Sequence, residues 1–129
     1  MKKIIEFEIP FPTYKTKKST QLLSLNVANR LNHFIKTQIK NRFKMECGLF
    51  IPKAKKTYDS LIIEATTIRN INKKFDAINT SLPIKWVEDV LIEKGYIKDD
   101  DKNKIIINPT KLGVKNTYKT TLNIKVYTT

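Results

Sequence analysis

The stretch LPIKWVEDVLIEKG, residues 82–95, decides the fold that we expect for this chain. Its apolar residues recur at steps of three and four, which is typical of an amphipathic helix packed on a core. Pro83 lies in the first turn, and Gly95 follows the last turn, where a left-handed cap is usual. Three candidate N-cap residues precede the helix: Asn79, Thr80 and Ser81.

Four other stretches have the pattern of β-strands. Residues 4–9 alternate apolar residues with glutamates and end before two prolines, as a half-buried strand does. Residues 58–69, YDSLIIEATTIR, are rich in β-branched types. Residues 104–108 and residues 118–127 predict two further strands towards the end of the chain.

Between the first two strands the sequence predicts a loop and a second helix. Residues 13–20, TYKTKKST, are polar and aperiodic, which indicates an exposed loop. The helix covers residues 22–44 and is followed by a weak strand pattern at residues 47–51. Its apolar residues recur at helical steps: Leu23, Val27, Leu31, Phe34, Ile35 and Ile39. Its other face is basic, either as a ridge for phosphates or as an ordinary solvated face: Arg30, Lys36, Lys40, Arg42 and Lys44.

The predicted elements follow the order β-α-β-α-β-β. This order indicates an α+β fold with a mixed sheet packed against two helices. The chain has 129 residues, 40% of them apolar, and no internal repeat or Gly/Ser linker divides it. We therefore expect a single domain over residues 1–129.

The charge of the chain favours a polyanionic partner. Its 25 Lys and Arg residues exceed its 12 Asp and Glu residues and give a formal net charge of +13. The alternative is a lysine-rich composition that only solvates an ordinary surface. The charge alone does not decide between these two interpretations.

Cysteine usage and the start of the chain indicate the compartment. The lone Cys47 excludes an internal disulfide and a cysteine-based zinc site, and we expect it to be a buried apolar residue in a reducing compartment. The apolar run of residues 1–12 is interrupted by two glutamates and ends in prolines, so it predicts neither a signal peptide nor a membrane span. We therefore expect a cytoplasmic protein that has no membrane partner.

Acidic residues flank the helix at residues 82–95. Asp76 precedes it, Asp89 lies within it one turn after Lys85, and the run Asp99, Asp100 and Asp101 follows it. Converging carboxylates are the ligands that Mg²⁺ prefers, and the bound ion can activate a water against a phosphodiester. The alternative is an ordinary Lys85/Asp89 surface pair with an acidic turn after the helix.

The segment FDAINTSLPIKWVEDVLIEKGYIKDDDKNKIIINP, residues 75–109, resembles the signature region of the RusA family of Holliday-junction resolvases. That signature has an acidic D-x-D-N turn, a lysine, an aspartate one turn later, a glycine at the helix end and a D-D pair. The matching positions, in the longer spacing of phage-type members, are Asp76, Asn79, Lys85, Asp89, Gly95, Asp99 and Asp100. Weaker similarity lies in EIPFPT at residues 8–13 and in SLN at residues 24–26, which HF follows at residues 33–34.

The resemblance implies a RusA-like fold and a dimeric, magnesium-dependent endonuclease that cuts four-way and other branched DNA. It implies that Asp76 and Asp100 bind Mg²⁺, for which Mn²⁺ can substitute, and that Lys85 stabilises the charge on the scissile phosphate. Asp89 and Asp99 would support this site, and Asn79 would order the turn. The resulting catalytic set is Asp76, Lys85 and Asp100.

One position departs from the family pattern. Ile78 stands where the acidic turn has its second aspartate, and it cannot coordinate a cation. Glu64, Asp99 or Asp101 could replace that carboxylate; otherwise the protein is a catalytically silent DNA-binding relative or an inhibitor of a nucleoprotein partner. A helix of this length is roughly 20 Å long, with Asp76 and Asp100 at its two ends, so a returning loop or a dimer partner would have to complete the site.

The residues expected to contact DNA lie in the basic stretches of the chain: Lys15, Lys17, Lys18, Arg30, Lys73 and Lys74. The aromatic Tyr14 is a further candidate. We expect Trp86 to belong to the core rather than to stack on a base, and the lone His33 to pack on the first helix. An RNA-binding module is a third hypothesis, which the lack of a Phe/Tyr-rich RNP strand disfavours.

Overall fold

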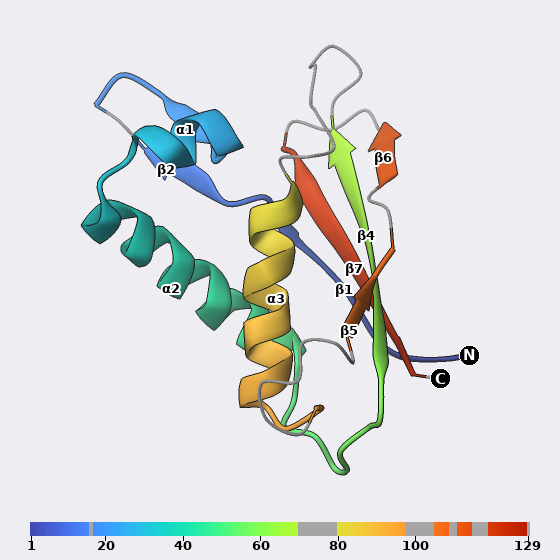
Figure 1. Ribbon diagram of the computed structural model, residues 1–129. Helices are drawn as coiled ribbons and strands as arrows, with labels where there is room; N and C mark the ends of the chain where they lie inside the picture. Colours follow the sequence, from blue (N-terminus) through green and yellow to red (C-terminus); the bar gives the residue numbers. More distant parts are fainter. Residues whose placement is uncertain (16, 70–79, 98–104, 109–110, 115–118, 129) are drawn as a thin grey trace.

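The computed structural model describes residues 1–15, 17–69, 80–97, 105–108, 111–114 and 119–128. These residues form a mixed sheet with helices on one face (Figure 1). The elements in chain order are β1 (Lys2–Pro10), β2 (Thr13–Lys15), β3 (Thr20–Leu22), α1 (Leu25–Arg30), α2 (His33–Phe50), β4 (Leu61–Arg69), α3 (Ser81–Glu93), β5 (Ile105–Ile107), β6 (Lys111–Val114) and β7 (Thr121–Thr128). The predicted α+β class with a mixed sheet is confirmed.

The sheet joins the two ends of the chain. Its strand order is β1-β7-β4-β5, and β6 also pairs with β4. β7 is antiparallel to both β1 and β4, whereas β5 and β6 are parallel to β4. The N- and C-termini consequently lie close together (Figure 1).

Alternation along the strands gives the sheet a buried inner face. Leu61, Ile63 and Ala65 of β4 are fully buried, and they pack with the buried apolar residues of β1 and β7. The residues between them point to the opposite side, which we call the outer face. A shift of one residue in register would exchange these two sets, so the apolar pattern fixes the register.

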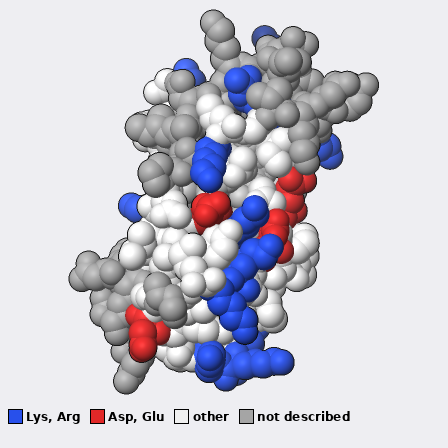
Figure 2. All heavy atoms as spheres, turned by 90° about the vertical axis from the view of Figure 1, so that its right-hand side faces the viewer, with Lys and Arg blue, Asp and Glu red and all other residues white. Residues whose placement is uncertain are grey.

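On the outer face, lysines and glutamates lie side by side. Lys125 of β7 stands opposite Glu6 of β1 and Glu64 of β4. Lys3 forms an ion pair with Glu6, and Lys111 Nζ lies 3.7 Å from Glu64 Oε1. The hydrogen bond from Lys3 lowers the pKa of Glu6. Interleaved charges of both signs are also visible on the side of the molecule in Figure 2.

Helices α2 and α3 cover the inner face and contact each other. The rings of Phe43 in α2 and Trp86 in α3 have centroids 5.7 Å apart, and Phe50 of α2 stacks on Phe7 of β1 at 5.4 Å. Trp86 is 4% exposed, which confirms its prediction as a core residue. Cys47 is also buried as expected, and burial raises the pKa of its thiol to about 12.

The two ends of α3 are fixed by different means. Gly95 has φ 86°, which confirms the predicted left-handed cap, and its N–H donates to the Ile92 carbonyl at 3.1 Å. At the other end, the side chain of Thr80 forms no cap hydrogen bond. Its hydroxyl lies 3.0 Å from the hydroxyl of Thr67, and both residues are fully buried. This contact holds the start of α3 against the end of β4.

The continuous helix predicted over residues 22–44 is wrong. Ser24 caps α1 by accepting from Val27 N at 3.2 Å, and Asn32 starts α2 by accepting from Ile35 N at 2.9 Å. Because the Asn32 side chain caps a free N–H group at the start of a new helix, the chain turns between α1 and α2. Phe34, in the first turn of α2, is 72% exposed and does not belong to the apolar face predicted for it.

Three further local predictions need correction. The weak strand at residues 47–51 is wrong, because α2 continues to Phe50. Residues 13–20 contain strand residues instead of a plain loop, since β2 and β3 pair antiparallel. The sequence did not predict β6, which is short and is held by backbone pairing to Thr66–Arg69 of β4. His33 is exposed at the first position of α2, and its predicted packing on the helix is therefore also wrong.

Candidate nucleic-acid interface

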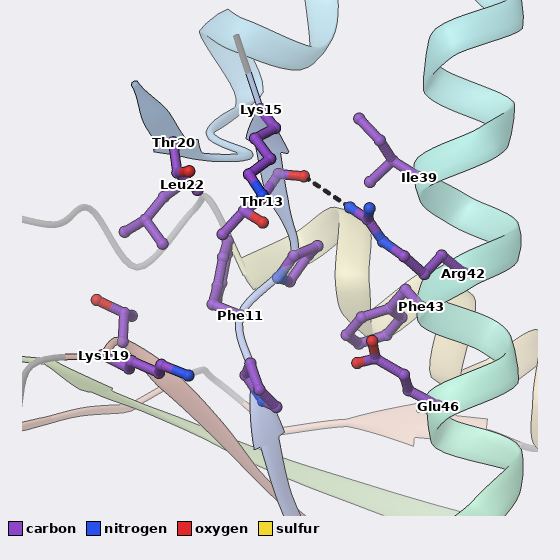
Figure 3. Close-up of a pocket in the computed structure, with 13 residues that line it drawn as sticks. Phe11, Thr13, Lys15, Thr20, Leu22, Ile39, Arg42, Phe43, Glu46 and Lys119 are labelled. Atoms are coloured by element: carbon purple, nitrogen blue, oxygen red, sulfur yellow. Dashed lines mark hydrogen bonds between the residues drawn. The ribbon is translucent and has the colours of Figure 1, made fainter. Parts of the chain in front are cut away.

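The end of β1, the β2–β3 hairpin, α2 and the residues just before β7 surround a cavity of about 570 Å³ (Figure 3). We call it the basic cavity because three of its lining residues are cationic, namely Lys15, Arg42 and Lys119. Each of these comes from a different part of the chain. The cavity therefore exists only in the folded protein.

Arg42 is the best-fixed cation of the basic cavity. Its Nη2 donates to the Thr13 carbonyl at 3.1 Å, which holds the guanidinium towards the hairpin. Figure 3 shows Arg42 and Glu46 extending from α2 on one side and Lys119 extending from the opposite side. The rings of Phe11 and Phe43 lie between them, and both are nearly fully buried. The cavity thus combines an apolar floor with cations and one carboxylate at its rim.

The basic cavity adjoins the end of β4. Phe11 N donates to the Thr120 carbonyl at 3.0 Å, so the chain after β1 is joined to the chain before β7. Thr121 pairs with Pro10, which lines the cavity, and also with Ile68 near the end of β4. Because β7 lies between β1 and β4, two strand spacings, about 10 Å, separate Pro10 from Ile68 near the end of β4.

Several predicted site residues lie outside the described residues. They are Asp76, Asn79, Asp99 and Asp100, the DNA-contact candidates Lys73 and Lys74, the departing position Ile78 and the possible replacement Asp101. Within the described ranges, no group of three or more His, Cys, Asp and Glu side chains could hold a metal ion. The predicted metal site therefore depends on residues outside the described ranges.

The described members of that site are on α3. Lys85 is exposed and Asp89 is half-buried one turn later. Among the described residues, Lys85 and Asp89 form no ion pair, either with each other or with a third side chain. The ammonium group of Lys85 therefore has no carboxylate within ion-pair distance in this part of the chain.

Covalent geometry limits where Asp76 and Asp100 can be. Asp76 precedes Thr80 by four residues, and Asp100 follows Ile97 by three. These segments reach at most about 14 Å and 11 Å, and α3 between them is roughly 20 Å long. The combined reach of about 25 Å exceeds the length of α3, so chain length alone does not require a second copy to complete the site.

Glu64, the residue suggested as a replacement for the carboxylate missing at Ile78, lies on the opposite face of the sheet from α3. Its side chain is on the outer face of the sheet, next to Lys111. Helix α3 covers the inner face, with Lys85 and Asp89 on that helix. The sheet separates Glu64 from these two residues.

The structure brings some of the predicted DNA contacts together. Lys15 lines the basic cavity, while Lys17 and Lys18 are exposed in the turn between β2 and β3. Arg30 is exposed at the end of α1, where its Nε donates to the Asn26 carbonyl at 3.3 Å. Tyr14 is half-buried against the core instead of being freely exposed.

Two cavity residues were not predicted as site residues. Arg42 belongs to the basic residues noted along the predicted helix. Choosing the arginines of that set as phosphate-binding candidates would have included it. Lys119 has no local pattern, because only the antiparallel pairing of β1 with β7 brings it to the cavity.

Comparison with known proteins identifies no family for this chain. No protein-family model matches the chain, and no curated protein matches it. In the described part of the chain, no helix combines the length and the apolar content that a membrane crossing requires.

Proposed function

We propose that the protein is a RusA-like, magnesium-dependent, structure-specific endonuclease that binds branched DNA, including Holliday junctions, at the basic cavity. The observation that carries this proposal is the convergence of Lys15, Arg42 and Lys119 on one cavity in a chain of net charge +13. DNA backbones carry one negative charge per phosphate and bind such cationic surfaces by releasing counterions. Folding gathers these charges from distant segments.

The chemistry of the cavity suits a phosphodiester strand. Arg42 uses one side of its guanidinium for the Thr13 carbonyl, and its remaining N–H groups are available to phosphate oxygens. The ammonium groups of Lys15 and Lys119 add point charges at the rim. The concave shape between hairpin and helix favours a bent or branched strand over a straight surface contact.

Cleavage is the part of the proposal that depends on the resemblance to the RusA family. Asp76 and Asp100 would hold Mg²⁺, which supplies an activated water and neutralises charge on the cleaved phosphate. Lys85 would stabilise the same charge, and its ammonium group has no acidic partner in the described chain that would compete. Asp89 and Asp99 would support these groups, and Asn79 would order the turn.

Ile78 favours a second candidate function. With one carboxylate fewer, the protein would bind DNA without cutting it, as a nuclease-derived binder or inhibitor. In both forms the protein would act as a homodimer in the cytoplasm of a bacterial host, in phage-type recombination or repair. The two candidates share the basic cavity and differ only in catalysis.

Incubation of the purified protein with a synthetic four-way junction and Mg²⁺ separates these candidates. Symmetric nicks that disappear in Asp76→Asn and in Asp100→Asn support the endonuclease, and Lys111→Gln serves as a charge control that keeps its activity. Retained binding without nicks supports the silent form. If the junction does not bind even at low salt, both candidates are wrong.

A further inference from the structure

A second group of lysines lies at the opposite end of α3 from the basic cavity. Lys53, Lys55 and Lys56 are exposed on the chain between α2 and β4, in the sequence PKAKKTY. We call residues 52–58 the lysine loop. It appears as the green segment below α2 and α3 in Figure 1.

The backbone of the lysine loop is fixed to the end of α3. Ala54 N donates to the Lys94 carbonyl and Tyr58 N to the Tyr96 carbonyl, both at 2.9 Å. The hydroxyl of Tyr96 donates to the Pro52 carbonyl at 2.8 Å, and the hydroxyl of Thr57 donates to the Gly95 carbonyl at 3.3 Å. A ligand would therefore meet an ordered loop, which lowers the entropic cost of binding.

Aromatic rings support one of the three lysines. Tyr58 and Tyr96 stack with centroids 6.2 Å apart and an interplanar angle of 7°. Lys56 Nζ lies 5.2 Å from the centroid of the Tyr58 ring, within the range of a cation–π contact. The contact restrains the side chain of Lys56 and leaves its charge intact.

The charges of the lysine loop are not neutralised by the described part of the chain. Lys53, Lys55 and Lys56 have no ion pair there, whereas Lys3 and Lys111 on the outer face each have a glutamate partner. Three ammonium groups within four residues that form no ion pair in this part of the chain favour an anionic ligand with several charges in a row. A phosphodiester backbone is such a ligand.

We propose that the lysine loop is a second DNA-backbone contact, separate from the basic cavity; this inference rests on the DNA-binding function proposed above. Tyr58 forms an isolated β-bridge with Ile97, the residue before the segment that carries Asp99 and Asp100. DNA held by the loop passes beside Ile97 at the end of the described part of this region.

The test compares two triple variants that lose the same charge. The first is Lys53→Gln/Lys55→Gln/Lys56→Gln, and the matched control on the outer face is Lys3→Gln/Lys111→Gln/Lys125→Gln. Affinity for a four-way junction is measured by fluorescence anisotropy at several salt concentrations without Mg²⁺. We expect the loop variant to bind about 30-fold more weakly at 0.1 M salt, with a log–log salt slope smaller by two to three, and the control to change less than about 3-fold.

The outcomes separate this inference from the proposed function. If the wild type binds and the two triple variants weaken equally, the lysine loop is not a DNA contact, while the proposed function stands. If the wild type does not bind the junction, both fail. If loop and control variants bind DNA alike but only the loop variant loses binding to phosphatidylserine vesicles, the loop is a membrane contact and the inference is overturned.

A folding control completes the experiment. Circular dichroism spectra of the two triple variants should match that of the wild type. If the loop triple is misfolded, Lys53→Gln/Lys55→Gln keeps Lys56 on the Tyr58 ring and is measured in its place. We expect this double variant to lose about 10-fold in affinity, and an unchanged affinity would overturn the inference.

Discussion

The lysines of the outer face and the cations of the basic cavity differ in their neighbours. On the outer face, Lys125 lies between Glu6 and Glu64, and Lys111 is within 4 Å of Glu64. In the basic cavity, Lys15 and Arg42 have no ion pair among the described residues, although Glu46 is one turn from Arg42. The same residue types therefore give a nearly neutral surface in one region and a positive one in the other.

Because of this difference, the net charge of the chain does not by itself predict where DNA binds. A phosphate that approaches the outer face meets glutamates as well as lysines, and exposed pairs are screened within about 10 Å at 0.1 M salt. A phosphate at the basic cavity meets Lys15 and Arg42, which form no ion pair among the described residues. Binding to DNA should therefore depend on which lysines are removed and not only on how many.

The largest effect should come from removing the cavity cations. We expect Lys15→Gln/Arg42→Gln/Lys119→Gln to weaken binding to a four-way junction by about 100-fold at 0.1 M salt, because three charge-assisted contacts are lost. Fluorescence anisotropy measures the loss. The outer-face triple described above is the matched control, and an equal loss in both variants would remove the distinction between the two regions.

A smaller effect should follow from Arg42→Lys. Lysine keeps the charge, but it cannot donate to the Thr13 carbonyl and present a planar fork to a phosphate at the same time. We expect about 10-fold weaker junction binding with an unchanged salt slope. Wild-type affinity in Arg42→Lys would show that only charge matters at this position.

Removing glutamates should make the outer face more positive and should strengthen its binding to DNA. Glu6→Gln/Glu8→Gln/Glu64→Gln removes the carboxylates and leaves its lysines unpaired. We expect roughly 5-fold tighter binding to linear duplex and a steeper salt dependence, since new cations can then release counterions. Electrophoretic mobility shifts over a salt series measure both. If the affinity for duplex DNA does not rise, the lysine–glutamate pairs are not the reason why this face binds DNA weakly.

The smallest effect should come from Glu46→Gln at the rim of the basic cavity. Removing a like charge beside the bound phosphate should tighten binding about 2- to 3-fold. Asn41→Asp, on an exposed part of the same helix that does not line the cavity, adds a charge there and should change affinity less. Weaker binding in Glu46→Gln would mean that its carboxylate accepts a hydrogen bond from the ligand.

Local patterns predicted the elements whose stability is local. Helix α3, its Gly95 cap and strand β4 follow from apolar periodicity and β-branched composition, which act within a few residues. The break before α2 was missed because the side chain of Asn32 competes with a periodicity that continues across it. Strand β6 was missed because its pairing partner, β4, lies more than forty residues earlier in the chain.

The candidate site was predictable only in part for the same reason. Lys15 belongs to a visible basic run, but the cavity also needs Arg42 from α2 and Lys119 from the approach to β7. Their convergence results from the pairing of β1 with β7, which joins the two ends of the chain and has no local sequence pattern. The catalytic set Asp76, Lys85 and Asp100 stays a prediction.

Competition between a four-way junction and a linear duplex of equal length tests most directly whether the basic cavity recognises branched DNA. The protein is titrated with the labelled junction at 0.1 M salt without Mg²⁺, and the unlabelled DNAs then compete. We expect the junction to compete at least about 10-fold better, and the cavity triple variant to lose this preference. Equal competition by both DNAs, or a preference that survives in the triple variant, would contradict recognition of branched DNA by the basic cavity.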